Sequence, residues 1–105
     1  MPVELKEKSL QSAAILAKCL GDENRLRILL SIGRERKSVS NIVDELAISQ
    51  PLASHHLKEL KRALLVTVER SGPFVYYQVA DPIILDILDR LGQLAADLLR
   101  KRSAF

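Results

Sequence analysis

The chain has 105 residues, of which 48% are hydrophobic and 28% charged, a composition typical of one globular domain rather than a disordered segment. No apolar run approaches the ~20 residues of a membrane span, and the charged N-terminus lacks a signal-peptide core. One cysteine, Cys19, excludes an intrachain disulfide, so we expect a cytoplasmic protein. The net charge of +3 is compatible with a polyanionic partner, although many basic proteins bind none.

Apolar periodicity predicts two helices in the first third of the chain. The first covers residues 4–20, because alanines and leucines recur along one side of it from Leu10 to Leu20. Gly21 ends this helix, and Asp22 can cap a second helix that buries Leu26, Leu29, Leu30 and Ile32. A polar connection, residues 33–37, follows.

The middle of the chain predicts a helix-turn-helix. Residues 38–39 can add a short strand before Ser40 caps a helix over 41–47. After a very short turn, Ser49 is a good N-cap and Pro51 is tolerated in the first turn of a second helix running to about Leu64. Two short helices joined this tightly are typical of a DNA-reading unit.

The second of these helices has two different sides. Ala53, Leu57, Leu60 and Leu64 form an apolar stripe. The opposite side carries Pro51, Ser54, His55, Lys58, Lys61 and Arg62, with Gln50 at its edge. A helix of this kind can enter a major groove, with small polar groups at base edges and lysines at phosphates. An ordinary amphipathic surface helix is the alternative interpretation.

After this helix the spacing of the apolar residues changes to the alternation typical of β-strands. Residues 65–70 and 74–79 are rich in β-branched and aromatic residues and flank a Gly-Pro turn, which predicts a hairpin. Its position directly after the helix-turn-helix is that of a wing, with Arg70 and Ser71 near the tip. A last helix over 82–101 has a continuous leucine and isoleucine stripe.

The first and last helices carry more apolar surface than a small core can cover, which predicts a homodimer. The alternative is that these faces complete the core of one chain. The expected interface residues are Leu10, Ala13, Leu16, Leu88, Leu91, Leu94 and Leu98. The fold class that follows is mainly helical with a β-hairpin wing: a single winged helix-turn-helix domain over 1–105, dimerising through its terminal helices.

Three blocks of sequence, within about residues 16–80, resemble the ArsR/SmtB family of dimeric winged-helix repressors. They are Leu20-Gly21-Asp22-Glu23-Asn24-Arg25-Leu26-Arg27-Ile28-Leu29, Leu46-Ala47-Ile48-Ser49-Gln50-Pro51-Leu52-Ala53-Ser54-His55-His56-Leu57-Lys58-Glu59-Leu60 and Val75-Tyr76-Tyr77-Gln78-Val79. The resemblance implies a DNA-binding repressor on a palindromic operator in double-stranded DNA. It also implies that Gln50, Ser54 and His55 approach bases, with Ser49 and Lys58 at the backbone and Arg70 on the wing.

One position departs from the family pattern. The recognition helix commonly ends in Ala-Gly-Leu, whereas this chain has Ala63-Leu64-Leu65. Where the glycine is left-handed, leucine costs ~1–2 kcal/mol, so we expect either a strained turn or a different shape.

Other residues replace the usual metal donors of the family, so we expect no metal or other cofactor. The sequence does not identify an inducer or establish that there is one. The positions matching a Cys-x-Cys pair are Ser38 and Ser40, and the last helix offers only aspartates. His55 and His56 point ~100° apart and cannot share one ion within a chain. We interpret His56 as a structural histidine and His55 as the one that meets DNA.

Other functions remain open at this level. Cys19 is interpreted as a buried apolar residue, with a thiol-sensing repressor as the alternative. A winged-helix module that binds a protein partner is a further alternative. We expect no enzyme, because the chain has no phosphate-binding loop, nucleophile elbow or His–carboxylate pair at useful spacing.

Overall fold

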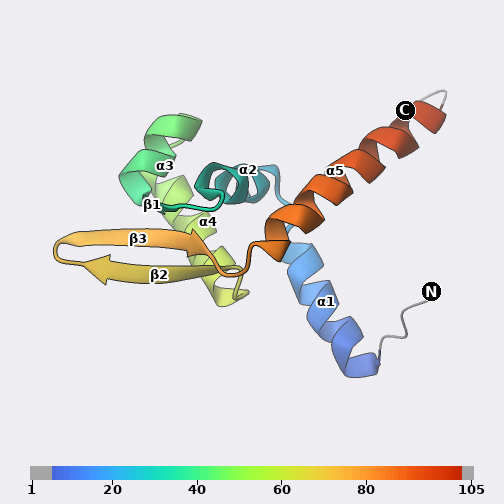
Figure 1. Cartoon of the computed structure of the whole chain (residues 1–105), viewed down its shortest axis with the longest axis horizontal. Coiled ribbons are helices and arrows are strands. Elements are labelled where there is room, and N and C mark those ends of the chain that lie inside the picture. Colours follow the sequence, from blue (N-terminus) through green and yellow to red (C-terminus); the bar gives the residue numbers. More distant parts are fainter. Residues whose placement is uncertain (1–5, 103–105) are drawn as a thin grey trace.

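The computed structural model describes residues 6–102 and has a winged helix-turn-helix architecture (Figure 1). A bundle of short helices supports a three-stranded sheet, and a helix near each terminus extends away from the wing. In chain order the elements are α1 (Glu7–Cys19), α2 (Glu23–Ile32), β1 (Arg36–Ser38), α3 (Val39–Leu46), α4 (Gln50–Arg62), β2 (Val66–Ser71), β3 (Phe74–Val79) and α5 (Ile83–Lys101). Within residues 6–102 no helix has the length and apolarity to cross a lipid bilayer.

The sheet is antiparallel, with strand order β1-β3-β2. Ser71 pairs with Phe74, so Gly72 and Pro73 alone make the hairpin turn, and Gly72 adopts a φ of 61° that favours glycine. Because β1 pairs only near the far end of β3, opposite Tyr76 to Gln78, the tip of the β2–β3 hairpin extends beyond the helices as a wing. The predicted hairpin is confirmed, with Arg70 and Ser71 next to its turn.

The core lies between α2, α3, α4 and the inner face of the sheet. Its fully buried side chains include Ile28 and Leu29 of α2, Ile42 of α3, and Leu57 and Leu60 of α4. Val66 and Val79, at the paired ends of β2 and β3, close the core from the sheet side. The helical periods in the sequence therefore identified the buried sides of α3 and of α4 up to Leu60. On α2 the prediction was wrong for Leu30, which is 60% exposed, because the core-facing side of that helix carries Ile28 with Leu29 and Ile32.

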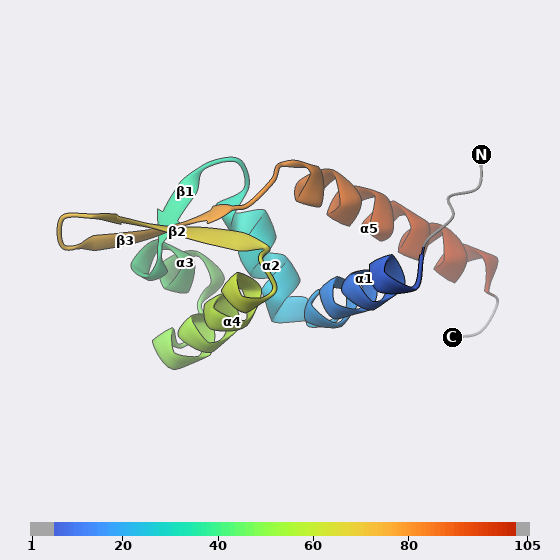
Figure 2. The ribbon, with the colours of Figure 1, turned by 90° about the horizontal axis from the view of Figure 1, so that it is seen from below.

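The two terminal helices extend from the same end of the winged unit, opposite the wing (Figure 2). Cys19 is the only buried residue described in α1 and Leu88 the only one in α5. Most of the apolar residues expected at a dimer interface are exposed by 39–55%: Leu10, Leu16, Leu91, Leu94 and Leu98, with Ala13 exposed beside them. Leu88 differs, because it is 8% exposed and belongs to the core of its own chain.

Several predicted helix boundaries are corrected by the structure. The third helix begins two residues earlier than expected, because Ser38 and not Ser40 is its N-cap: the Asn41 amide donates to Ser38 Oγ at 3.2 Å. The first helix begins at Glu7, and residues 1–5 lie outside the described range. The helix that follows the turn ends at Arg62 rather than near Leu64.

Leu64 therefore does not extend the buried stripe of α4. It lies two residues beyond the helix, is 80% exposed and adopts a φ of 64°. The Leu65 amide donates to the Leu60 carbonyl at 2.9 Å and the Leu64 amide to the Lys61 carbonyl at 3.0 Å, the two hydrogen bonds of a Schellman motif. The turn thus keeps the family's glycine-type geometry with a leucine in the left-handed position, at a cost of ~1–2 kcal/mol.

We predict that Leu64→Gly raises the free energy of unfolding by about 1 kcal/mol, because it removes this left-handed strain. Glycine also makes the unfolded chain more flexible, which offsets part of the gain. Urea denaturation at one fixed protein concentration measures the change. Leu64→Ala is the matched control: it removes the exposed side chain but keeps a Cβ, so its stability should stay near that of the wild type. Equal stability of the Gly and Ala variants would contradict the strain.

Candidate nucleic-acid interface

The turn between α3 and α4 is built by local signals at both of its ends. Ala47 ends α3 in the left-handed conformation, with a φ of 53°. Ser49 then caps α4, its Oγ accepting the Leu52 amide at 3.2 Å, and Pro51 stands in the first turn. The predicted cap and proline are confirmed, and together they fix where the exposed N-terminal end of α4 begins.

The inner side of α4 is held by a polar contact as well as by leucines. His56 is 5% exposed, and Arg25 of α2 donates from Nε to His56 Nδ1 at 3.1 Å. Because an arginine can only donate, His56 Nδ1 must carry a lone pair and the proton of the neutral ring lies on Nε2. Nε2 is 3.8 Å from Asp22 Oδ1. The interpretation of His56 as a structural histidine beneath the helix agrees with this geometry.

The protonation of His56 follows from these surroundings. Burial lowers the pKa of His56 below its ordinary 6.5, and this effect outweighs the Asp22 carboxylate, which favours the charged ring. The Arg25 guanidinium and the neighbouring His55 ring lower the pKa further. Asp22 is also the N-cap of α2, and the Arg25 amide that it accepts lowers the pKa of its carboxyl. His56 is therefore a neutral acceptor at pH 7.

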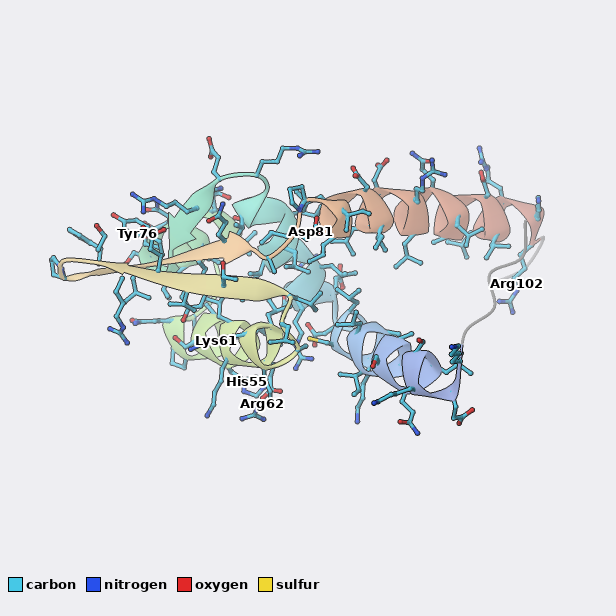
Figure 3. All side chains as sticks on the ribbon, turned by 60° about the horizontal axis from the view of Figure 1, so that its bottom comes forward. His55, Lys61, Arg62, Tyr76, Asp81 and Arg102 are labelled. Carbon is cyan, nitrogen blue, oxygen red and sulfur yellow. The ribbon has the colours of Figure 1, made fainter. Side chains whose placement is uncertain are left out.

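The outer side of α4 is exposed along its whole length. The structure brings together on this side the residues expected there: Gln50, Pro51, Ser54, His55, Lys58, Lys61 and Arg62. His55 and Arg62 extend from the side of α4 that faces away from the sheet (Figure 3). Arg62 lies 3.4 Å from Glu59 Oε1, an exposed pair of the kind that contributes little to stability. A polar, cationic surface is thus left free beside a buried apolar one.

The wing places Arg70 on the same side of the sheet as these residues. Val66, Val68 and Arg70 lie on one face of β2, because they are two residues apart, and Val66 faces the core that α4 covers. The other side of the wing carries a separate cluster: Arg36 lies 2.9 Å from Glu69 and 4.5 Å above the Tyr76 ring. Arg70 is exposed near the tip of the hairpin, next to the Ser71–Phe74 pair, and can contact a duplex that lies against α4 and extends to the wing.

The positions that match the family's metal sites do not supply suitable donors. The Ser38 hydroxyl is occupied as the α3 cap, and hydroxyls are poor substitutes for thiolates. Asp81 accepts the Ile83 amide at 2.9 Å, and Asp97 pairs with Arg100 on α5. Among the described residues, no three His, Cys, Asp or Glu side chains gather closely enough to hold an ion. The chemistry of these donors does not fit a transition metal.

Cys19 is buried at the end of α1, as the apolar interpretation expects. It is 6% exposed, its Sγ lies 3.8 Å from the Glu59 carbonyl, and Arg25 Nη1 donates to the Cys19 carbonyl at 3.4 Å. The sequence reasoning did not identify Arg25, which contacts both α1 and α4. A signal was present: Asp22 and Arg25 belong to the first of the three family-like blocks.

The fold and this surface define a winged helix-turn-helix protein of the DNA-binding type. A family model described as a helix-turn-helix domain matches residues 20–69. The transcriptional repressor SmtB of Mycobacterium tuberculosis is 38% identical over 96 residues, which cover 88% of this chain and 71% of that protein. The chain belongs to the ArsR/SmtB family, whose members are DNA-binding transcriptional regulators and not enzymes.

Solved structures show the same fold. HlyU from Vibrio cholerae superposes with a TM-score of 0.76 at 29% identity, over 85% of this chain and 97% of that one. NolR from Sinorhizobium fredii superposes with a TM-score of 0.75 at 26% identity, over 90% and 95% of the two chains. With coverages of 85% and 90%, these superpositions include more of the chain than the helix-turn-helix alone.

We predict that acid destabilises the protein through His56. Its pKa is about 6.5 in the unfolded chain and lower in the folded one, so below pH 6.5 the unfolded chain binds more protons. The stabilisation is therefore complete above about pH 6.5 and is lost as the pH falls below it, by at most about 1.4 kcal/mol per pH unit. His56→Gln keeps an acceptor for Arg25 without titrating and should reduce this dependence in urea denaturation between pH 7.5 and 5.

The matched control for this measurement is His55→Gln on the exposed side of α4, which should leave the pH dependence close to that of the wild type. An unchanged dependence in His56→Gln would show that other groups cause the acid sensitivity.

Proposed function

We propose that the chain is a homodimeric repressor that binds a palindromic operator in double-stranded DNA, one α4 entering each half-site. In this proposal residues 1–105 form one winged-helix domain, and α1 and α5 provide the dimerisation helices. The observation that carries it is the division of α4 into a buried leucine–histidine side and a fully exposed polar, cationic side.

The proposed contacts follow from position on α4 and the wing. Gln50, Ser54 and His55, in the N-terminal half of α4, approach base edges, where amide, hydroxyl and imidazole groups can donate or accept. Pro51, which has no amide proton, fixes the backbone of the first turn of α4, the end that approaches the bases. Ser49, Lys58 and Arg62 contact phosphates of the same half-site, and Arg70 contacts the backbone from the wing. In a two-fold dimer the half-sites lie about 34–36 Å apart.

The dimer is supported by the exposed apolar surface of the terminal helices. Leu91, Leu94 and Leu98 of α5 and Leu10 and Leu16 of α1 are each exposed by 39–55%. The three leucines of α5 are spaced on one stripe of that helix, and Leu16 lies beside the stripe that carries Leu10. Apolar surfaces of this extent usually mark association. Leu88, buried within the chain, supports the base of α5 and is not part of the proposed contact.

The proposed repressor works without the metal sites that its family commonly uses. The reason is the donor chemistry described above, serine hydroxyls and scattered aspartates in place of thiolates and imidazoles.

We predict different effects of two substitutions on α4. His55→Ala should relax base preference at one position per half-site, at a cost of about 1–3 kcal/mol in discrimination. Lys58→Ala should weaken binding to all sequences alike and reduce the slope of log K against log salt by about one for each phosphate that the protein no longer neutralises. Selection from a random DNA pool identifies the operator, and fluorescence anisotropy at several salt concentrations then measures both variants.

Arg90→Ala is the control for charge, because Arg90 is an exposed cation on α5, away from α4. It should leave base preference unchanged. If both α4 variants bound the selected operator like the wild type, the assignment of α4 to the groove would be wrong. If no sequence were enriched while a protein partner competed for α4, the protein-interaction alternative would replace the repressor.

We also predict that Leu91→Glu with Leu94→Glu weakens the dimer roughly 100-fold or more, since carboxylates would be buried in an apolar contact. Sedimentation velocity over a range of concentrations measures the change. Leu30→Glu is the matched control: Leu30 is 60% exposed on α2, outside the terminal helices, and should leave the dimer intact. A monomer mass for the wild type at all concentrations would contradict the proposal.

A further inference from the structure

A hollow of about 330 Å³ opens where the end of α1, the start of α2 and the end of α4 meet. We call it the cationic hollow, because Lys18, Arg25 and Arg62 line it from three different helices, together with Cys19, Glu59 and Ala63. Its volume is at the lower end of the range of small-molecule sites, about 300–1,000 Å³. Glu59 is the one carboxylate among the lining residues, and it is already paired with Arg62.

Arg25 is held in place before any ligand arrives. Its Nε donates to His56 Nδ1 at 3.1 Å and its Nη1 to the Cys19 carbonyl at 3.4 Å, which fixes the plane of the guanidinium. Within residues 6–102, its Nη2 donates to no other side chain or carbonyl. A guanidinium held through Nε and Nη1, with Nη2 left to donate, can bind a carboxylate oxygen with little loss of side-chain entropy.

An apolar groove of about 430 Å³ continues from the cationic hollow, since Ile15, Arg62 and Ala63 line both. Its other walls include Leu16 of α1, Leu64 and Leu65 after α4, and Ile84 of α5. A molecule with a charged head at Arg25 and Arg62 would therefore have a hydrocarbon surface within reach of its tail. Three cationic side chains at one end and aliphatic walls at the other define the chemistry of the ligand.

We propose that the cationic hollow and its apolar groove bind a small amphipathic carboxylate, and that this ligand weakens DNA binding. The carboxylate contacts Arg25 and Arg62, and the hydrocarbon chain lies along Ile15, Ala63 and Leu65. The effect on DNA rests on the proposed function, because Arg62 is also assigned to a phosphate there. One guanidinium cannot serve both anions equally, so ligand and operator compete for it, and the coupling is reciprocal.

The experiment titrates acetate, hexanoate and decanoate into the purified full-length protein by isothermal calorimetry, without DNA. We expect saturable binding of one molecule per chain, with affinity rising from acetate to decanoate as more hydrocarbon is buried. Arg62→Gln should weaken decanoate binding about tenfold through the lost charged hydrogen bond, and Ala63→Met should weaken it by filling the junction of the two spaces. Arg34→Gln, an exposed cation in the loop before β1, is the matched control and should bind like the wild type.

Competition is then measured with the selected operator. Decanoate should raise the apparent Kd of the wild-type complex for DNA and have a smaller effect on Arg62→Gln. Absence of saturable binding, or binding that Arg62→Gln and Ala63→Met leave unchanged, would overturn the proposal. The proposal would also be overturned if Ala63→Met changed the mass of the dimer and left decanoate affinity unchanged. A partner chain, and not a carboxylate, would then occupy the hollow and its groove. Because the titration needs no DNA, failure to find an operator would overturn the proposed function and leave the ligand site supported.

Discussion

The hydrogen bond from Arg25 to His56 is the polar contact that holds the buried side of α4 against α2. It supplies a donor to a buried imidazole nitrogen that leucine packing alone would leave without a partner, at a cost of about 1–3 kcal/mol. The same guanidinium reaches the Cys19 carbonyl at the end of α1, and the Arg25 amide is capped by Asp22. One residue therefore joins the helix proposed to read DNA to a helix proposed to hold the dimer.

Because α4 is held through its inner side, the side chains on its outer side are not needed for packing. The side chains of Ser54, His55 and Lys58 are exposed and make no hydrogen bond to another described residue. The end of α4 shows the same separation, since the Leu64 side chain contributes little to the core and its backbone carries the strain of a left-handed residue. The geometry of the turn, and not the side chain at position 64, directs the chain into β2.

Local signals explain how much of this was predictable. The cap at Ser49, the proline at 51, the Gly72 turn and the apolar side of α4 up to Leu60 depend on one or two turns of backbone, so periodicity and residue type were enough to predict them. On α2 the same periodicity favoured Leu30, which is exposed, over the buried Ile28. Ser38 and Ser40 are both suitable caps, and the pairing of β1 with β3 decided between them. The partner of His56, 31 residues away, and the burial of Leu88 depend on tertiary packing that no local pattern encodes.

The proposed regulation depends on the terminal helices, which contact the winged unit at only a few places. α1 meets it mainly at Cys19, and the cationic hollow lies at that same junction, beside Arg25 and Arg62. In the proposal, a ligand bound there affects the DNA contacts without displacing a core side chain. It does so because it pairs with the guanidinium groups that already line the hollow. In the proposed mechanism the chain keeps the architecture of its family, and an anion at the junction of α1 and α4 takes the place of a metal in the control of DNA binding.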